Sequence, residues 1–470
     1  MVKAASSLTL SETESVCPEC LARIPAQRVA EGSDVYLRKT CPEHGSFSTV
    51  IWRGAPPFAS WVRPKLPSYP EAPFTAADRG CPYDCGLCPD HRQHTCSVLL
   101  EVTAGCDLGC PVCFADAGGS VATDPDLATI AGWYRRVLDA GGPFNMQLSG
   151  GEPCLRDDLP EIIRLGRSLG FTFFQLNTNG LRLARDPDYL RRLQDAGLTT
   201  VFLQFDGTRD EIHARLRGRA LADQKQAAIE NCARHGVGVV LVPTLVPGVN
   251  AGEIGAIIAH ALRYAPAVRG VHFQPISYFG RYGRGQTTPP DDERITIPEV
   301  IDAISVQTHG AIRAESFRPP GCENALCSFH GNFVIMPDGR LIPLTAHRDA
   351  MNCCDTPPVA KEGAARAREF VAVHWAAPAQ TLGGATHDAM QPSLGAWDQF
   401  LERAHTHTFC ISGMAFQDAW TLDLERLRDC CIHVLSLDGR LIPFCAFNLT
   451  DREGRALYRP AHRSPRSGAA

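Results

Sequence analysis

Six short apolar runs alternate with helical patterns through the middle of the chain. The runs extend from Ser97 to Thr103, Phe144 to Leu148, Phe171 to Leu176, Thr200 to Phe205, Val237 to Thr244 and Gly270 to Gln274. Helical patterns, such as Leu127 to Leu138 and Leu221 to His235, lie between most of them. Because the runs are continuously apolar, they are typical of parallel strands buried on both faces. Right-handed crossovers would curl six such units into a partial barrel, so we predict an α/β fold with its chemistry at the carboxyl ends of the strands.

The strongest chemical signal follows the first of these strands. Cys106, Cys110 and Cys113 have the spacing C-x3-C-x2-C. A loop of this length can bring three thiolates to one 4Fe-4S cluster and leave the fourth iron without a protein ligand, open to a substrate. A structural zinc knuckle with a fourth ligand nearby is the alternative, and the next motif disfavours it.

Gly150, Gly151 and Glu152 follow the second predicted strand. Paired glycines let the backbone approach a ligand closely, and a glutamate can accept a hydrogen bond from an ammonium group. Alone, this sequence would be an ordinary loop. One βα unit after the cysteine triad, it resembles the motif with which radical S-adenosylmethionine (SAM) enzymes bind the amino group of SAM. We therefore predict a radical SAM enzyme with Cys106, Cys110 and Cys113 as its catalytic cluster ligands.

Polar residues also stand at the ends of two later strands. These residues are Asn177, Asn179, Gln204 and Asp206. At the mouth of a barrel they could contact the ribose or carboxylate of SAM, or the substrate. Helix N-caps and turns explain each of them equally well.

Two cysteine groups precede the predicted barrel. Four cysteines, Cys81, Cys85, Cys88 and Cys96, lie within sixteen positions, which is enough for a complete 4Fe-4S cluster or a zinc site. We favour an auxiliary 4Fe-4S cluster.

Further upstream, Cys17-x2-Cys20 pairs with Cys41-x2-His44. This is the two-knuckle spacing of a ribbon that holds one tetrahedral metal ion. Structural zinc and a rubredoxin-like iron both remain open.

A second auxiliary cluster is predicted downstream, with the ligands Cys322, Cys327, Cys430 and Cys445. Its assignment depends on an internal repeat, because the sequence Asp-Gly-Arg-Leu-Ile-Pro occurs at 338–343 and again at 438–443. Each copy predicts a β-hairpin with a type I′ turn. Cys327-x2-His330 and Cys430-x2-His433 precede the two copies, so we prefer Cys430 to Cys431 as a ligand.

Five other cysteines lack ligand spacing and are assigned no role: Cys154, Cys232, Cys353, Cys354 and Cys410.

Composition excludes some classes of partner. The net charge is −5 and the pI about 6.3, with no basic stripe, so we expect no nucleic-acid partner. The N-terminus is polar and no run approaches the roughly 20 apolar residues of a membrane span, which predicts a cytoplasmic protein. Twenty cysteines in such a protein indicate metal sites more than disulfides.

With 470 residues, the chain exceeds a single core of roughly 250–300 residues, so we expect one catalytic domain with accessory modules. The predicted division is a metal ribbon at 1–60, an auxiliary-cluster segment at 61–96, the radical SAM core at 97–282, an irregular C-terminal region with an auxiliary cluster at 283–460, and a disordered tail at 461–470. Residues 351–408 are weakly patterned, and little chemistry is expected there.

Several longer stretches carry a family resemblance. They are Gly80 to Cys88, His94 to Cys96, Cys110 to Ala115, Val242 to Val246, Phe273 to Ile276, Phe416 to Asp418 and Ile442 to Asn448. In these stretches the chain resembles the radical SAM family that contains the archaeal tetraether lipid synthase and the methanogen dihydropterin methylase. Only 351–408 and the tail fall outside the resemblance.

The resemblance implies a rubredoxin-like module, a radical SAM core and auxiliary 4Fe-4S clusters on either side, acting on an unactivated carbon. The leading expectation is carbon-carbon bond formation on lipid chains, with peripheral contact to the membrane. The alternative is methylation or methylene transfer onto a pterin or another small molecule, and a non-catalytic iron-sulfur electron carrier is a remote third. Either enzyme would need SAM and a reducing donor such as a ferredoxin or flavodoxin.

Overall fold

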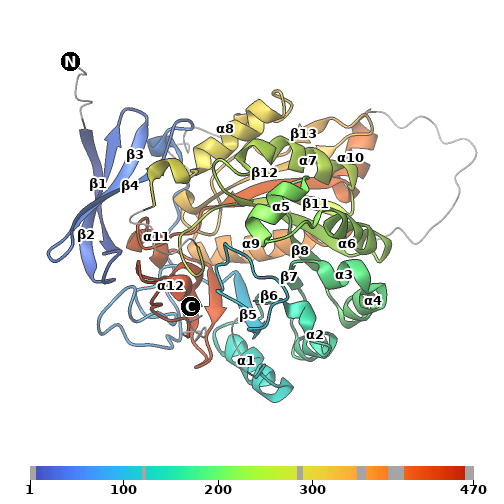
Figure 1. The fold of residues 1–470 in the computed structure, drawn as a ribbon, viewed down its shortest axis with the longest axis horizontal. Helices are drawn as coiled ribbons and strands as arrows, with labels where there is room; N and C mark the ends of the chain where they lie inside the picture. Colours follow the sequence, from blue (N-terminus) through green and yellow to red (C-terminus); the bar gives the residue numbers. More distant parts are fainter. Residues whose placement is uncertain (1–6, 119–122, 283–288, 347–355, 379–395, 461–470) are drawn as a thin grey trace, which may run out of the picture.

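The computed structural model describes residues 7–118, 123–282, 289–346, 356–378 and 396–460, which form two β-sheets with helices packed around the larger one (Figure 1). The predicted disordered tail at 461–470 lies outside the described residues, as do Cys353 and Cys354. Both sheets carry cysteines at the ends of their strands.

The smaller sheet is an antiparallel meander at the N-terminus. Its strands are β1 (Ser7–Val16), β2 (Arg23–Glu31), β3 (Asp34–Cys41) and β4 (Gly45–Trp52), paired in chain order. Side chains of β2 alternate between exposed and buried positions, as expected for a sheet with one solvated face. The two turns that carry the predicted ribbon ligands follow β1 and β3.

The larger sheet contains the predicted barrel. Its parallel core strands are β5 (Ser97–Thr103), β6 (Asn145–Gly150), β7 (Phe174–Thr178), β8 (Thr200–Gln204), β9 (Gly238–Val242) and β11 (Val268–Pro275), with β10 (Thr244–Leu245) beside β11. The crossover helices are α1 (Leu127–Asp139), α2 (Leu159–Ser168), α3 (Leu181–Arg185), α4 (Pro187–Ala196), α5 (Asp210–Arg217), α6 (Ala222–Arg234) and α7 (Ile254–Arg263). They cover the outer face, so the predicted partial (βα)6 barrel is confirmed (Figure 1).

The C-terminal region is more regular than the sequence indicates. It contains α8 (Ile297–Gln307), β12 (Ser328–Ile335), β13 (Leu341–Pro343), α9 (Ala360–His374), α10 (Ala396–Thr406), β14 (Thr408–Met414), α11 (Leu424–Arg428), β15 (Ile432–Leu435), β16 (Leu441–Pro443) and α12 (Phe444–Asn448). Strand β14 extends the core beside β11 and is followed by β12 and β13, whereas β15 and β16 extend it beside β5. These strands pair with partners far away in the sequence, which local patterns do not reveal.

The repeated hexapeptides form the two predicted hairpins, β12–β13 and β15–β16. Their turns differ from the expected type I′, which needs positive φ at both central residues. Only the glycines, Gly339 (φ 81°) and Gly439 (φ 80°), have positive φ. Each turn therefore bends through a single left-handed glycine, and the preceding aspartate keeps an ordinary conformation.

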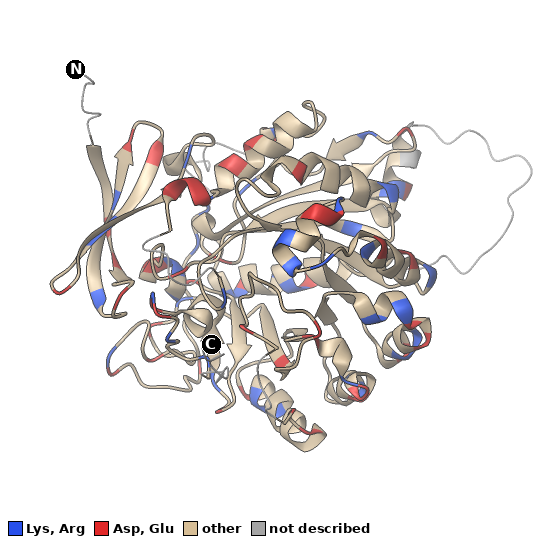
Figure 2. Ribbon diagram, in the orientation of Figure 1, with Lys and Arg blue, Asp and Glu red and all other residues tan. Residues whose placement is uncertain are grey.

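The outer surface mixes both signs of charge. Figure 2 shows basic and acidic residues interspersed along the helices that surround the barrel, with pairs such as Arg164–Glu161 and Arg191–Asp188. Among the helices of the described segments, none combines the length and apolar character that crossing a membrane requires.

A buried ion pair joins the small sheet to the C-terminal region. Arg28 on β2 donates to Asp423 at 2.6 and 2.8 Å and to Glu425 at 2.6 Å. The side chains of Arg28 and Asp423 are 9% and 3% exposed. Thr13 on β1 donates to the same aspartate at 2.8 Å, so the contact fixes two strands against α11.

Replacing Arg28 with alanine should cost about 3–5 kcal/mol of unfolding free energy, because Asp423 would stay buried without a counter-charge. Urea unfolding of the metal-loaded chain, followed by tryptophan fluorescence, measures this cost. Arg38→Ala is the matched control, since Arg38 pairs with Glu31 at the surface and its loss should cost less than about 1 kcal/mol. Equal costs for the two variants would contradict the anchoring role.

Candidate active site

The predicted cluster loop follows β5 directly, and a second segment holds it in place. Arg281 donates from Nε to the carbonyl of Cys110 at 2.8 Å, and the backbones of Cys113 and Arg281 exchange two hydrogen bonds of 2.8 Å. The close approach requires glycine at Gly280, where a Cβ would clash with the carbonyls of Cys113 and Phe114. Contacts with the segment around Arg281 therefore hold the loop in place.

The paired glycines also serve this loop. The backbone NH of Gly151 donates to the carbonyl of Thr103, and that of Glu152 to the carbonyl of Gly105, each at 2.8 Å. A Cβ on either glycine would collide with carbonyls of the cluster loop. Their first effect is thus to bring β6 against the loop, which adds to the ligand approach expected from the sequence.

Glu152 is buried and held by three donors. Its carboxylate accepts from Thr178 Oγ1 at 2.6 Å, from the NH of Asn179 at 2.7 Å and from the NH of Cys154 at 3.0 Å. Burial raises the pKa of Glu152, and these hydrogen bonds oppose the rise. A carboxylate has about four acceptor positions, so one remains for an ammonium group in the cavity that Glu152 lines.

The cysteine triad has the character of a metal site. Burial raises the pKa of Cys106 to about 12 and also raises the pKa of Cys110. Burial has the same effect on Cys232, so the pKa alone does not mark a metal site. The triad fits an iron-sulfur cluster through its spacing and its place in the cavity lining, and a bound cluster would supply the positive charge that stabilises the thiolates. Among the nearby charges, Arg217 lowers the pKa of Cys110.

The predicted SAM contacts divide into two groups. Asn177, Asn179 and Gln204 line the cavity. Asn179 also donates to Asp107 of the cluster loop at 2.7 Å. Asp206 is completely buried and is absent from the cavity lining, because Arg217 donates to both its carboxylate oxygens at 2.7 and 2.8 Å. It therefore lies behind the site and supports Arg217.

Arg217 and Lys225 are residues that the sequence analysis missed. Arg217 at the end of α5 also donates to the carbonyl of Val112 in the cluster loop at 3.2 Å. Lys225 on α6 donates to the carbonyl of Asn179 at 2.6 Å and to Gln204 at 2.9 Å. Burial lowers the pKa of Lys225 to about 7. Neither residue belongs to a recognisable sequence motif. Only their contacts in the structure show that they belong to the site.

A cavity of about 890 Å³ extends from the cysteine triad through the inside of the barrel. Its volume is in the range of small-molecule sites. Helix α9 closes one side, with Arg366, Ala367, Arg368, Phe370 and Val371 in the lining. Helix α9 lies within 351–408, where little chemistry is expected from the sequence, and its residues form one wall of the cavity.

Comparison with known proteins agrees with this geometry. Residues 100–261 match the radical SAM superfamily, and residues 9–53 match the HMPTM N-terminal zinc ribbon domain. The chain is 35% identical, over 94% of its length and 94% of the relative's, to 7,8-dihydro-6-hydroxymethylpterin dimethyltransferase of Methanocaldococcus jannaschii. It belongs to the radical SAM family of this methyltransferase. SAM and a 4Fe-4S cluster are therefore its cofactors.

Other relatives of this radical SAM enzyme match less of it. A probable GTP 3′,8-cyclase of Methanothermobacter marburgensis is 32% identical over 58% of this chain and 91% of that protein. Among solved structures, Streptococcus suis SuiB bound to its precursor peptide SuiA matches with a TM-score of 0.34 and 14% identity, covering 39% of this chain and 40% of that one.

The N-terminal ribbon of the enzyme brings its four predicted ligands together. Candidate ligand atoms of Cys17, Cys20, Cys41 and His44 lie within 4.8 Å of one another. Tetrahedral zinc-sulfur bonds of about 2.3 Å place sulfur atoms about 3.8 Å apart, so the group has the size of a single-ion site. Three cysteines with one histidine are a usual zinc set, in agreement with the matched zinc ribbon.

The first auxiliary group keeps three of its four predicted members. Cys81, Cys85 and Cys88 line one small cavity, and His91 joins them there. The His91 Nε2 atom lies 2.8 Å from the carbonyl of Cys430. Cys96 lies elsewhere, beside Cys322 and Cys431. The ligand set of this auxiliary cluster stays a prediction.

The second auxiliary group divides in a similar way. Burial raises the pKa of Cys430, and the charges of Cys445 and Cys327 raise it further. Among the described residues these three thiols do not form a tight ligand group, so the cluster predicted from them stays a prediction. Cys322 lies apart from them, beside Cys96 and Cys431. Spacing along the chain thus did not predict that Cys96, Cys322 and Cys431 group together in space.

Replacing Cys17 with serine should remove one metal ion per chain and leave the iron-sulfur absorption unchanged, because the ribbon site is separate from the barrel. Elemental analysis of the purified variant measures the loss and identifies the ion as zinc or iron. Cys232→Ser, which changes a buried thiol on α6 outside any ligand group, should keep the full metal content. Full metal content in Cys17→Ser would exclude the ribbon site.

Proposed function

We propose that this radical SAM enzyme methylates, or transfers a methylene group to, a pterin-like heterocycle. The family relationship supports this choice, since the relative that matches 94% of the chain is named as a dihydropterin dimethyltransferase. Carbon-carbon bond formation on lipid chains, the leading expectation from the sequence, has no comparable support. A row of amide and hydroxyl groups inside the otherwise mostly apolar cavity carries the proposal.

Amide and hydroxyl groups line the cavity along the inward faces of the core strands. Gln147 donates to Ser97 Oγ at 2.7 Å and accepts from Asn177 Nδ2 at 3.2 Å, and Gln175 donates to Asn177 Oδ1 at 2.7 Å. All four line the cavity. Because each amide has two donor hydrogens and an acceptor oxygen, this row keeps unused hydrogen-bonding capacity. It suits the alternating donors and acceptors along the edge of a pterin.

A lipid chain could not form hydrogen bonds with this row of amide and hydroxyl groups. An alkyl chain that displaces water from amide groups leaves their remaining donors and acceptors without partners, which costs roughly 1–3 kcal/mol for each group. The apolar part of the lining, including Phe114, Phe202 and Phe329, can instead pack against the faces of a flat ring.

Within this function, Cys106, Cys110 and Cys113 hold the cluster and Glu152 receives the amino group of SAM. When bound, the cluster and SAM would together supply a 5′-deoxyadenosyl radical that removes hydrogen from the substrate, and SAM or a reduced folate would supply the transferred carbon. Asn177, Asn179 and Gln204 orient SAM and substrate, and the buried barrel keeps water away from the reacting carbon. A ferredoxin or flavodoxin supplies electrons, and the enzyme works in the cytoplasm.

Anaerobic enzyme is given SAM, dithionite and 6-hydroxymethyl-7,8-dihydropterin, with and without methylenetetrahydrofolate as a second one-carbon donor. It should form 5′-deoxyadenosine and a methylated pterin in at least one of the two reactions, and liquid chromatography with mass spectrometry measures both products. Cys110→Ala should form neither product, because one cluster ligand is lost, while its other metal sites stay loaded. In a parallel reaction with a lipid extract, the lipids should remain unchanged. Coupled lipids together with an unchanged pterin would reject the proposal in favour of lipid chemistry.

Gln147→Leu should weaken pterin binding by about tenfold, the effect of losing one hydrogen bond of about 1.4 kcal/mol. SAM cleavage should continue in this variant, so the ratio of 5′-deoxyadenosine to product should rise. Gln226→Leu, on the exposed face of α6, provides the control and should match the wild type. Unchanged pterin affinity in Gln147→Leu, measured by fluorescence titration, would remove the polar row from substrate recognition.

A further inference from the structure

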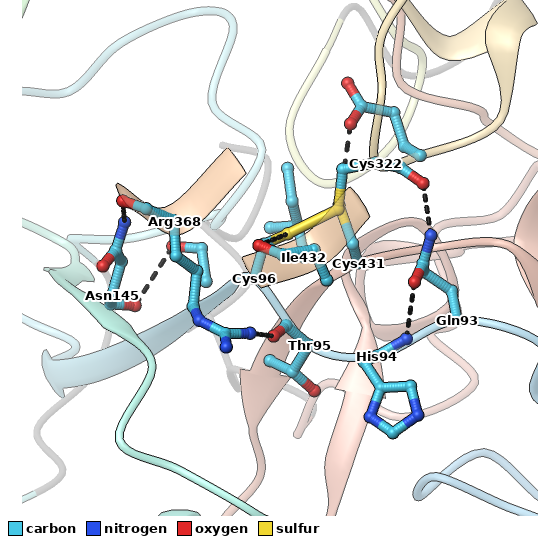
Figure 3. Close-up of a disulfide and its surroundings, with 12 residues drawn as sticks. Gln93, His94, Thr95, Cys96, Asn145, Cys322, Arg368, Cys431 and Ile432 are labelled. Atoms are coloured by element: carbon cyan, nitrogen blue, oxygen red, sulfur yellow. Dashed lines mark hydrogen bonds between the residues drawn. A yellow bond between two sulfur atoms is a disulfide. The ribbon is translucent and has the colours of Figure 1, made fainter. Parts of the chain in front are cut away.

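Three cysteines from distant parts of the chain meet on the wall of the cavity. The sulfur atoms of Cys96, Cys322 and Cys431 lie within 4.8 Å of one another, and all three residues are buried and line the cavity. Figure 3 shows them converging beside Ile432 and Gln93. Over the described residues, only this group and the ribbon bring three or more candidate metal ligands so close together.

The backbone fixes this arrangement. Strands β5 and β15 pair in parallel with Ser97 opposite Ile432, so Cys96 and Cys431 lie side by side just before the two strands. The NH of Cys96 donates to the carbonyl of Cys431 at 2.8 Å. The carbonyl of Cys322 accepts from Gln93 and Lys65, which holds the third cysteine against the other two.

A disulfide does not account for the group. Cys96 and Cys322 are joined through sulfur in Figure 3, but their Cα atoms are 7.7 Å apart. Disulfide-bonded cysteines usually have Cα atoms about 4.4–6.8 Å apart. A disulfide would also use only two of the three sulfur atoms, whereas one metal centre uses all three.

The surroundings suit an anionic centre with one open side. Lys65 and Arg368 bring positive charge to the site, since Arg368 donates to the carbonyl of Thr95 beside Cys96 at 3.0 Å. Among neighbouring carboxylates, Glu323 lies 3.7 Å from the sulfur of Cys431. The cavity fills the remaining side, because the three cysteines are part of its lining.

We propose that Cys96, Cys322 and Cys431 form one metal centre with three thiolate ligands at the floor of the barrel. Thiolate ligands select zinc or iron, as a single ion or an iron-sulfur cluster. The centre lies at the amino end of β5 and the radical SAM triad at its carboxyl end, which puts them about 20 Å apart. Substrate in the cavity then lies between two metal centres. This grouping does not depend on the identity of the substrate.

Metal analysis of the full-length, anaerobically reconstituted protein tests the grouping. Cys96→Ser, Cys322→Ser and Cys431→Ser should each lose the same increment, one ion for a single-ion site or about four irons for a cluster. The double variant Cys96→Ser/Cys431→Ser should lose no more than either single variant, because the two residues share one centre. Cys410→Ser, a buried thiol on the same cavity wall, should lose nothing.

A second double variant separates this centre from the group predicted by spacing. Cys96→Ser/Cys85→Ser should lose two increments, since the two cysteines belong to different centres. Loss of a single increment there would overturn the grouping, as would full metal content in Cys431→Ser. Peptide mapping without reductant that finds Cys96 linked to Cys322 in the reconstituted protein would also overturn it. Circular dichroism and retained ribbon metal show that each variant is folded, and the three single variants provide independent tests.

Discussion

The pairing of β5 with its two neighbours determines where the sulfur chemistry of this enzyme is located. In register, Ser97 lies opposite Asn145 of β6 on one side and opposite Ile432 of β15 on the other. The first pairing brings the Gly150-Gly151-Glu152 turn against the cluster loop. The second brings a cysteine from the end of the chain next to Cys96. Because parallel pairing leaves little freedom of register once side chains are buried on both faces, one seven-residue strand fixes both ends of the cavity.

Local features of the fold could be predicted from the sequence. The six core strands, the helices that begin near Leu127 and Leu221, and the ribbon turns all depend on residues close together in the chain, and their periodicity and spacing are visible there. The added strands β12 to β16 could not be predicted in the same way. Strand β14 is Thr-Phe-Cys-Ile-Ser-Gly-Met, and what makes it a strand is pairing with β11 and β12 on either side. Such long-range pairing leaves no signal in a short window.

In the candidate site, too, contacts between residues far apart in the sequence could not be predicted from local patterns. Spacing predicted the ribbon group correctly, because two short turns bring Cys17, Cys20, Cys41 and His44 together. For the radical SAM triad, spacing predicts the three ligands within one short loop. It assigned Cys96 and Cys322 to different clusters and gave Cys431 no role, although Cys96 and Cys322 meet across a sequence separation of 226 residues. Asp206 illustrates a related difficulty. A polar residue at a strand end predicts a site, but only the structure shows that Arg217 already occupies its carboxylate.

Like Arg217, other positively charged side chains lie near the candidate thiol groups. Outside the ribbon, each candidate group of thiols has a cation nearby: Arg217 at Cys110, Arg426 at Cys327, Arg428 near Cys81 and Lys65 near Cys431. Thiolate-ligated centres carry negative charge, and burying such charge without compensation is strongly unfavourable. Of the 46 lysines and arginines in the chain, the sequence does not reveal which four take this position. Because the charge and hydrogen bonds around an iron-sulfur cluster set its reduction potential, these cations would influence how readily a cluster held at each group accepts an electron.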